Sequence, residues 1–475
     1  MNDRLPFAPL HEQASLIAHG ELRSVELTEL YLDRIERYDG TLNAYTVVTA
    51  ERALAMARAA DEWTDAGVSR GPLHGLPLAL KDLIDVAGLP TAAGSLILRD
   101  NVAARDASVA RRLFEAGAVL LGKTHTVEFA FGGAGINHHY GTPWNPWDSE
   151  VQRLPGGSSS GSAVAAAAGL ASAAIGSDTG GSVRIPASFC GIVGLKPTFG
   201  RVSSAGVLPL DPRLDSVGPM ARCVADVGLL YSLLAGPDPA DPDTLAQPDL
   251  TDDDFEGEAG GTRLCIPREY FWEDVDPEVE GAVRASAQVF ADLGVHVDEI
   301  SMEELDQLTE LRARKSLIAV QTYASYREWL EERPDDFDPI VYERMLDGRD
   351  VSAHEYVEIS RAWKALRRRT AEALRNVDAL LAPATPFPAL PLEECDDWGE
   401  AYRRVNALCL RNTAAANQLG LCSISLPCGF TRGGLPVGLM LIGRPFEEAG
   451  LLRLARAYES AAGWSGRHPD LGGFD

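Results

Sequence analysis

The chain has 475 residues, of which 45% are hydrophobic and 24% charged, so it can bury the core of one large domain or of two to three ordinary ones at roughly 150 residues each. The formal net charge of −26 argues against a nucleic-acid partner, because phosphate contacts need basic surface. No apolar run approaches the roughly 18 residues that span a bilayer, and no signal-peptide pattern begins the chain. The seven cysteines are scattered and form no CxxC pair, which indicates a cytoplasmic, reducing compartment.

Apolar periodicity predicts two packing helices near the N-terminus, over residues 24–38 and 49–63. Ser24 is the expected N-cap of the first, and Asp39-Gly40 is expected to end it. From residue 71 onward, short apolar runs alternate with helical patterns. Strands are predicted over 76–80, 118–121, 171–175, 262–266, 379–382, 423–426 and 437–442, and helices over 108–116, 162–168, 276–294 and 447–462. The last two strands flank a Gly433-Gly434 turn, which predicts a hairpin.

This alternation of strands and helices predicts an α/β fold with a central sheet that is covered by helices on both faces. We expect one domain over residues 1–475, with a glycine-dense core at 71–235. Residues 236–261 are rich in proline and acidic residues, which predicts a solvated surface loop. Residues 301–375 are rich in charged helix formers and are predicted to form a helical insertion that acts as a cover.

Three short motifs match known patterns without the context that those patterns require. Residues 117–124 fit the phosphate loop GxxxxGK[ST], but the residues between the glycines are themselves the predicted strand. Residues 157–161 fit the nucleophile elbow GxSxG, but Pro155 spoils the strand that should precede it. His125 and the His138-His139 pair lack the i, i+4 spacing of helical metal ligands, so we expect no metal site.

Three other segments together carry the groups that amide hydrolysis requires. Residues 75–82 end an apolar run with a lysine, and residues 155–162 and 176–186 hold serines between glycines. A serine that attacks a carbonyl must give its proton to a base within hydrogen-bond reach. Donors must then face the developing oxyanion, and glycines let backbone N–H groups approach it. The alternative is that GGSSSG is a flexible loop and Gly180-Gly181 only a turn.

Lys81 is the candidate base, because a lysine at the end of a buried strand can be kept neutral by desolvation. Only five of the 43 basic residues are lysines, and arginine, which the chain otherwise prefers, cannot be deprotonated. The alternative for Lys81 is an ordinary surface ion pair with Asp82. The residues alone leave both interpretations open.

The three segments resemble the amidase signature family of serine hydrolases. The resemblance is dense over residues 65–235 and continues more weakly at 380–386 and 425–439. It implies the amidase signature fold, with a large mixed central sheet, and amide hydrolysis without a metal or organic cofactor.

By this resemblance Lys81 is the catalytic base, Ser158 is the serine that relays the proton, and Ser182 is the nucleophile. The implied oxyanion hole consists of the backbone N–H groups of residues 179–182, namely Thr179, Gly180, Gly181 and Ser182 itself. Ser159 is implied to support the hydrogen-bond network around the lysine. The resemblance also implies a cis peptide bond before Ser158.

The expected function is hydrolysis of a small-molecule amide by a monomer or homodimer. Carbamate and ester hydrolysis are alternatives with the same chemistry, as is the role of glutaminase subunit in a tRNA-dependent amidotransferase. His125 and Ile185 depart from the family pattern, the latter where those glutaminase subunits usually carry glutamine. Ile136 and Leu208 are the candidate substrate contacts and indicate an uncharged substrate, whereas a dicarboxylate would need an arginine, for which Arg213 is the candidate.

Overall fold

The computed structural model describes residues 4–249, 255, 257–396, 399–464 and 466–474. Its strands are β1 Tyr45–Val48, β2 Pro77–Lys81, β3 Val119–Thr124, β4 Ala173–Asp178, β5 Val193–Lys196, β6 Ser216–Ala221, β7 Arg263–Pro267, β8 His296–Ile300, β9 Ala379–Pro383, β10 Cys422–Phe430 and β11 Pro436–Gly443. Within the described ranges they form one 11-stranded sheet in the order β1-β3-β2-β4-β6-β5-β10-β11-β9-β7-β8.

The sheet is mixed, as predicted. β2 pairs in parallel with both β3 and β4, whereas β4 pairs antiparallel with β6. β10 and β11 form the predicted antiparallel hairpin. The central strands β2, β3, β4, β5, β6 and β11 are buried along their whole length, which explains why they appear in the sequence as continuous apolar or small-residue runs rather than as alternating patterns.

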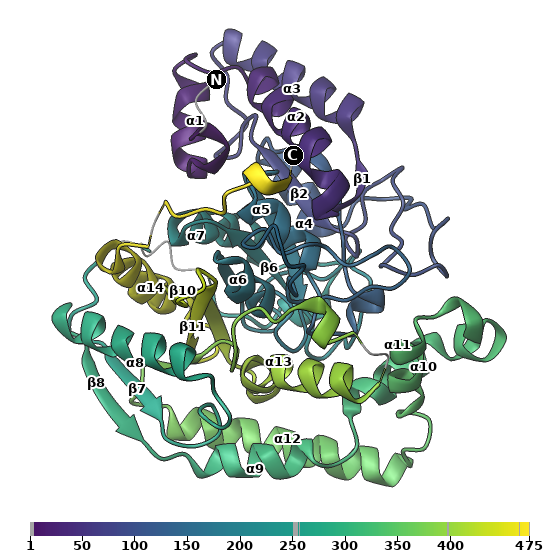
Figure 1. Cartoon of the computed structure of the whole chain (residues 1–475), viewed down its shortest axis with the longest axis vertical. Coiled ribbons are helices and arrows are strands. Elements are labelled where there is room, and N and C mark those ends of the chain that lie inside the picture. The colour runs from purple at the N-terminus through teal and green to yellow at the C-terminus, as the bar shows by residue number, and fades with distance from the viewer. Residues whose placement is uncertain (1–3, 250–254, 256, 397–398, 465, 475) are drawn as a thin grey trace.

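Helices lie on both faces of the sheet and at its two ends (Figure 1). Their bounds are α1 Leu10–Ala18, α2 Ser24–Leu42, α3 Ala50–Asp65, α4 Ser108–Glu115, α5 Ser160–Ala167, α6 Arg184–Cys190, α7 Val224–Leu234, α8 Pro277–Asp292, α9 Glu303–Arg312, α10 Leu317–Glu332, α11 Pro339–Leu346, α12 Ala353–Ala373, α13 Glu400–Leu419 and α14 Glu448–Ala462. α1–α3 lie at one end, and α9 and α12 lie at the other.

The end of α2 differs from the prediction, because the helix runs past Asp39-Gly40 to Leu42. The Asp39 carboxylate accepts the N–H groups of Ala44 and Tyr45, at 2.7 and 3.2 Å, and so stabilises the turn beyond the helix rather than ending it early. The start also differs. Ser24 is the first helical residue rather than the cap, and its Oγ donates to the Gly75 carbonyl at 2.8 Å.

Helix α5 consists of small residues that are all buried, and it packs against β4 in the middle of the molecule. A Cβ on Gly161 would lie 2.2 Å from the Ala44 carbonyl oxygen and 2.3 Å from the His125 nitrogen. Only glycine therefore allows the N-terminus of α5 to enter the core. This close approach brings the serine cluster that precedes the helix next to the carboxyl ends of β2 and β4.

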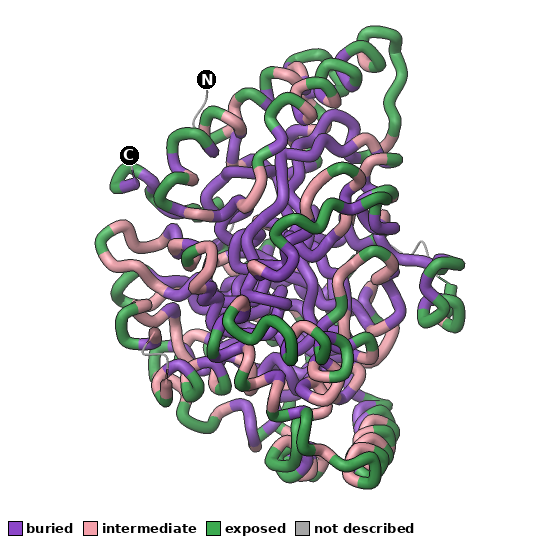
Figure 2. The backbone as a smooth tube through the Cα atoms, turned by 90° about the vertical axis from the view of Figure 1, so that its right-hand side faces the viewer, coloured by how far each residue is buried: buried purple, intermediate pink, exposed green. Residues whose placement is uncertain are grey.

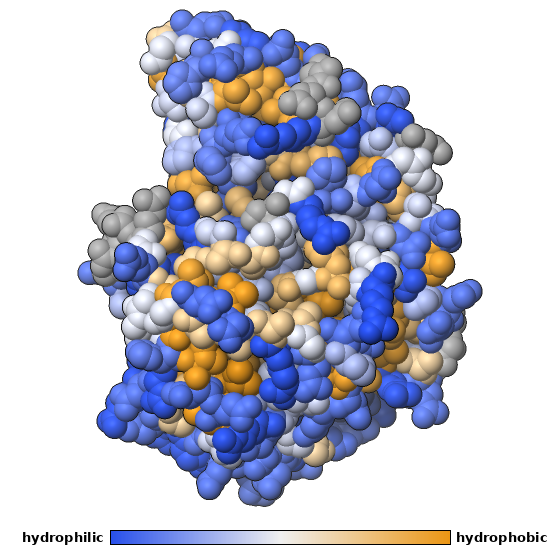
Figure 3. Space-filling view, turned by 60° about the vertical axis from the view of Figure 1, so that its left-hand side comes forward, coloured by the Kyte–Doolittle hydropathy of each residue, from blue (hydrophilic) through white to orange (hydrophobic). Residues whose placement is uncertain are grey.

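The predicted helical segment 301–375 forms α9–α12, and its backbone is largely exposed or half-buried whereas the sheet is buried (Figure 2). Part of the predicted acidic loop, residues 250–254 and 256, lies outside the described residues. That the whole chain is a single domain stays a prediction. Among the helices described, none has the length and apolarity to cross a membrane. Hydrophilic side chains cover the top and bottom of the face in Figure 3, with apolar groups between them.

Candidate active site

Lys81 is the last residue of β2, with β3 on one side and β4 on the other. Its side chain is 0% exposed, and Asp82 is 1% exposed. The Asp82 carboxylate accepts from Lys123 Nζ at 3.0 Å. The alternative of a surface pair between Lys81 and Asp82 is therefore wrong. Lys123 neutralises this buried acid. The lysine of the phosphate-loop motif therefore has a structural role, and the motif does not indicate a nucleotide site.

The Lys81 amine contacts two hydroxyls from distant parts of the chain. Its Nζ donates to Ser158 Oγ at 2.8 Å and to Ser177 Oγ at 3.0 Å. Burial lowers the pKa of Lys81 to about 7, although the Asp178 and Asp215 carboxylates act to raise it. Desolvation disfavours the ammonium form, so near neutral pH this lysine exists in both protonation states and can accept or donate a proton.

The serine cluster before α5 connects Lys81 to the loop that carries Ser182. The Gly157–Ser158 peptide bond is cis. The Ser159 N–H donates to the Ser182 carbonyl at 3.1 Å, and Ser159 Oγ donates to the Ser177 carbonyl at 3.1 Å. Ser159 thus holds two backbone segments together, which does not fit the nucleophile-elbow motif. Ser182 is 3% exposed and lies beside the segment that contacts Lys81.

The loop that follows β4 is held by a buried ion pair. The Arg184 guanidinium donates to both carboxylate oxygens of Asp178, at 3.0 and 2.9 Å, and neither side chain is exposed. Burial acts to raise the pKa of Asp178, but Arg184 holds it well below the usual range. The same carboxylate accepts the N–H groups of Gly181 and Val183, at 2.7 and 3.1 Å. A fixed negative charge thus determines the backbone path of this loop.

One of the four N–H groups of the implied oxyanion hole is already in use, because the Gly181 N–H donates to Asp178. In the part of the chain that the structure describes, the N–H groups of Thr179, Gly180 and Ser182 have no hydrogen-bond partner. They are the donors available to an oxyanion. Thr413 Oγ1 donates to the Gly180 carbonyl at 2.8 Å and keeps that carbonyl turned toward α13.

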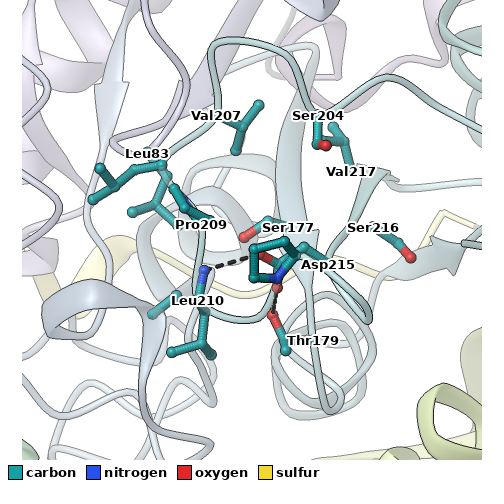
Figure 4. Close-up of a pocket in the computed structure, with 13 residues that line it drawn as sticks. Leu83, Ser177, Thr179, Ser204, Val207, Pro209, Leu210, Asp215, Ser216 and Val217 are labelled. Carbon is teal, nitrogen blue, oxygen red and sulfur yellow. Dashed lines mark hydrogen bonds between the residues drawn. The ribbon is translucent and has the colours of Figure 1, made fainter. Parts of the chain in front are cut away.

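Two cavities adjoin these groups. A small one of about 40 Å³ has Ser177, Thr179 and Leu208 in its wall, together with Asp215, which accepts from the Leu210 N–H and from Thr179 Oγ1 (Figure 4). A larger one of about 780 Å³ has Gly180 and Leu410 in its wall.

The two predicted substrate contacts therefore differ in position. Leu208 lines the small cavity. Ile136 is 2% exposed, packs in an apolar cluster that includes Ile185, and lines neither cavity.

Sequence reasoning missed two groups, Ser177 and Asp215. Ser177 stands within one of the three segments that indicated the site, but its contact with Lys81 depends on the parallel pairing of β2 with β4. Asp215 lies 36 residues along the chain from Thr179, and desolvation raises the pKa of its carboxyl to about 7. No local pattern marks its position in the sequence, because β6, which begins at the next residue and pairs with β4, contains Gly218 and Pro219.

Within the described residues, the hydrogen bonds of Lys81 go to serines, and no histidine contacts its amine in this way. Burial lowers the pKa of His125 to about 4. Both ring nitrogens of His138 contact carboxylates, those of Asp338 and Asp396. Within the described ranges, no group of three His, Cys, Asp or Glu side chains has the arrangement of a metal site.

Comparison with known proteins gives full-length matches. The family model for amidases matches residues 26–452. A glutamyl-tRNA(Gln) amidotransferase subunit of Chloroflexus aurantiacus is 40% identical, over 97% of this chain and 97% of the relative. The solved peptide amidase of Stenotrophomonas maltophilia has a TM-score of 0.82 at 32% identity, covering 98% of this chain and 100% of that chain. The solved glutamyl-tRNA(Gln) amidotransferase subunit of Thermotoga maritima has a TM-score of 0.81 at 30% identity, covering 99% and 98%.

These relatives overturn the prediction about partners. From the acidic net charge we expected no nucleic-acid partner, and a monomer or homodimer acting on a small molecule. That expectation is wrong, because relatives that align over 97% of the chain are named as one subunit of an amidotransferase of glutamyl-tRNA(Gln). The physical reason is that net charge is a sum over the whole chain, whereas a partner contacts one local surface.

The match of the family model and the full-length relatives agree with the arrangement around Lys81. The protein belongs to the amidase signature family and is an enzyme of the class that cleaves amide C–N bonds.

Proposed function

We propose that the protein hydrolyses a carboxylic amide through an acyl-enzyme on Ser182, with Lys81 as the base and Ser158 as the proton relay. The observation that carries this proposal is the 2.8 Å contact between Lys81 Nζ and Ser158 Oγ at a lysine whose pKa is lowered by burial to about 7. A general base is most effective when its pKa lies near the working pH.

In the acylation step, Ser182 Oγ forms a bond to the carbonyl carbon. Its proton passes to Ser158 Oγ while the Ser158 proton passes to neutral Lys81. The carbonyl oxygen becomes an oxyanion, which accepts from the N–H groups of Thr179, Gly180 and Ser182. When the tetrahedral intermediate collapses, the C–N bond breaks, and the proton returns from Lys81 through Ser158 to the leaving nitrogen.

In the deacylation step, water attacks the ester carbonyl and gives its proton through the same relay to Lys81. Collapse of the second intermediate releases the carboxylic acid, and Ser182 recovers its proton. Each donor removed from an oxyanion hole costs about 10²–10³ in kcat. We assign no such role to the Gly181 N–H, because it is already donated to Asp178.

For the substrate, the relatives support the side-chain amide of glutamine, with the chain acting as the glutaminase subunit of an amidotransferase whose acceptor is a tRNA-bound glutamate. The support is the 40% identity over 97% of the chain to proteins that are named as a subunit of such an enzyme. In such a complex the ammonia that Ser182 chemistry releases is used by a partner protein.

A second candidate is hydrolysis of other amides, with carbamates and esters as related substrates. It is favoured by Ile185, which is fully buried in an apolar cluster, and by Phe131 and Leu410 in the wall of the large cavity. Apolar side chains at these positions favour an acyl group that is apolar next to the scissile carbonyl, because a charged group there would lose its hydration.

The test is ammonia release by the purified chain from glutamine, a peptide amide, an aliphatic amide and an aryl amide, with wild type and Ser182→Ala. Adding the partner subunits separates the two candidates. Glutamine hydrolysis that requires the partners supports the amidotransferase role, whereas faster turnover of another amide than of glutamine, with the partners present or absent, supports the second candidate. Unchanged ammonia release by Ser182→Ala would refute the assignment of the nucleophile.

A further inference from the structure

The large cavity of about 780 Å³ has the size of a site for a drug-sized ligand, since such sites span roughly 300–1,000 Å³. It lies between α12 and α13, with the segment that joins α9 to α10 forming another part of its wall. Gly180, one of the proposed oxyanion donors, lies in the wall as well. The cavity therefore reaches the segment that carries one proposed oxyanion donor, and it has room for far more than the amide group.

The charge of this cavity is opposite to that of the protein. The whole chain has 43 basic and 69 acidic residues. The cavity wall instead contains six basic side chains and two acidic ones, Asp243 and Asp347. The basic residues are Arg213, Arg312, Lys315, Arg344, Lys364 and Arg367. A wall of one sign in a concave site raises the local concentration of ligands of the opposite sign.

The positions of the five lysines also distinguish this cavity from the rest of the surface. Of the five lysines in the sequence, Lys81, Lys123 and Lys196 are buried in the core, each at most 1% exposed. The other two, Lys315 and Lys364, are exposed, and both line the large cavity. At every other exposed position with a permanent positive charge, the described chain uses arginine. Lysine presents a compact point charge with three donors on a flexible stem, which suits an anionic group that arrives with the substrate.

The arginines of the wall are already engaged with protein groups. Arg213 donates twice to Asp211, at 2.9 and 2.6 Å. Arg344 contacts the Phe131 carbonyl, and Arg367 donates to the Gln418 carbonyl at 2.8 Å. These side chains shape the wall. The candidate Arg213 is thus paired with its own neighbour rather than free to bind a carboxylate.

Lys315 and Lys364 differ from these arginines. Across the residues that the structure describes, neither lysine makes a hydrogen bond or an ion pair, although Asp350 and Glu355 act on Lys315 electrostatically. Ser360 lies one helical turn before Lys364 on α12, and its Oγ is buried without a partner while lining the same cavity. Residues four apart on a helix share a face. Two ammonium groups that make no hydrogen bond or ion pair within the described residues, and one unpaired hydroxyl, therefore line one cavity.

We propose that this cavity binds a carboxylate at the far end of the substrate, so that the preferred substrate is an amide with an anionic group remote from the scissile carbonyl. Lys315 and Lys364 bind the carboxylate, Ser360 donates to it, and the apolar side chains near Gly180 contact the chain between the two ends. The inference rests on the proposed acyl-enzyme chemistry at Ser182, and it names the class of substrate that this chemistry serves.

The experiment compares monoamides of dicarboxylic acids, from four to ten carbons, with ω-hydroxy amides of equal length, by ammonia release. The readout is the ratio of kcat/KM for the acid to that for the alcohol, in wild type and in the double variant Lys315→Gln, Lys364→Gln. The matched control is Arg314→Gln, Arg361→Gln. It removes the same charge from exposed neighbours in the same two segments, and neither residue lines the cavity.

We expect wild type to prefer the longer acids by about tenfold, since each of two exposed ammonium groups adds only a modest attraction for a carboxylate. The ratio falls toward one in the lysine double variant and stays high in the control. Added salt lowers the wild-type ratio, because exposed charges are screened.

A ratio near one in wild type, or an equal fall in both double variants, would overturn the carboxylate site. Inhibition by a short RNA that depends on the two lysines, with no preference for the acids, would also overturn it, because the cavity would then be a nucleic-acid site. These outcomes are distinct from failure of the proposed function, in which Ser182→Ala would still release ammonia from both series.

Discussion

Titration of Lys81 is the property on which the proposed mechanism depends. Burial lowers its pKa from 10.5 to about 7, and this difference corresponds to roughly 5 kcal/mol between the two protonation states. At pH 7 about half of the enzyme would hold the neutral amine, compared with about one molecule in 3,000 for an ordinary lysine. Desolvation thus increases the population of active base by about a thousandfold.

We expect log kcat/KM for a neutral amide to rise with a slope of one up to about pH 7 and to level off above it, because only the neutral amine accepts the Ser182 proton. Asp215→Asn removes a carboxylate that raises the pKa of Lys81, so the rising limb should move to lower pH. The shift should be small, because burial raises the pKa of Asp215 itself to about 7 and its carboxyl is mostly protonated along that limb. The measurement is a pH–rate profile from about pH 5 to about pH 9. Lys81→Arg, which keeps the positive charge and cannot act as a base, is the control without turnover.

The same titration has a consequence for stability that does not depend on catalysis. Between about pH 7 and 10.5 the unfolded chain binds a proton at Lys81 that the folded chain does not, so the unfolding free energy rises with pH in this window. Relative to Lys81→Met, wild type should gain up to roughly 5 kcal/mol across it. A rate that is constant from pH 5 to pH 7, together with a stability difference that does not change with pH, would refute a neutral buried lysine.

Three further predictions concern other contacts of the site. Gly181→Ala should lower kcat by at least about a hundredfold. Gly181 has φ +134°, and an added Cβ would lie 2.0 Å from Thr413 Oγ1, so the loop would have to shift. A variant with wild-type kcat would contradict this close packing of the loop. Lys123→Met should lower the unfolding free energy by about 3–5 kcal/mol, since it leaves the Asp82 carboxyl, at 1% exposure, without its counter-ion. Urea denaturation measures this, and an unchanged midpoint counts against the buried pair. His138 contacts two carboxylates that raise its pKa although burial acts to lower it. The stability that its ring contributes, measured against His138→Gln, should be complete below its unfolded pKa and should be lost as pH rises through the raised folded pKa; a difference that grows with pH would contradict this.

Local patterns were sufficient to predict many of the elements. Buried strands such as β2 and β4 appear as apolar runs bounded by glycines, and the β10–β11 hairpin follows from its Gly433-Gly434 turn. Strands β1, β5, β6 and β8 were not predicted. β5 has only four residues and β6 contains Gly218 and Pro219, so neither has a local signal, and β8 is a mostly exposed edge strand with charged residues. Their pairing in the sheet, not their composition, makes them strands.

The candidate catalytic residues came from the resemblance to the amidase signature family, because the residues alone left a surface ion pair for Lys81 and a flexible loop for the serines as alternatives. Their relative positions could not be predicted. Lys81 and Ser158 are 77 residues apart in the chain, and their contact exists because β2 and β4 are neighbours in one sheet and because Gly161 lets α5 approach it.

The pKa of Lys81 likewise has no local cause. It depends on the packing that removes water from around the amine, and on carboxylates that other strands bring close. Composition was the least reliable guide to where the charged side chains lie on the folded protein. A chain with a net charge of −26 predicts an acidic surface everywhere, yet folding brings six basic side chains from separate segments around one cavity, because a sum over residues carries no information about which of them become neighbours.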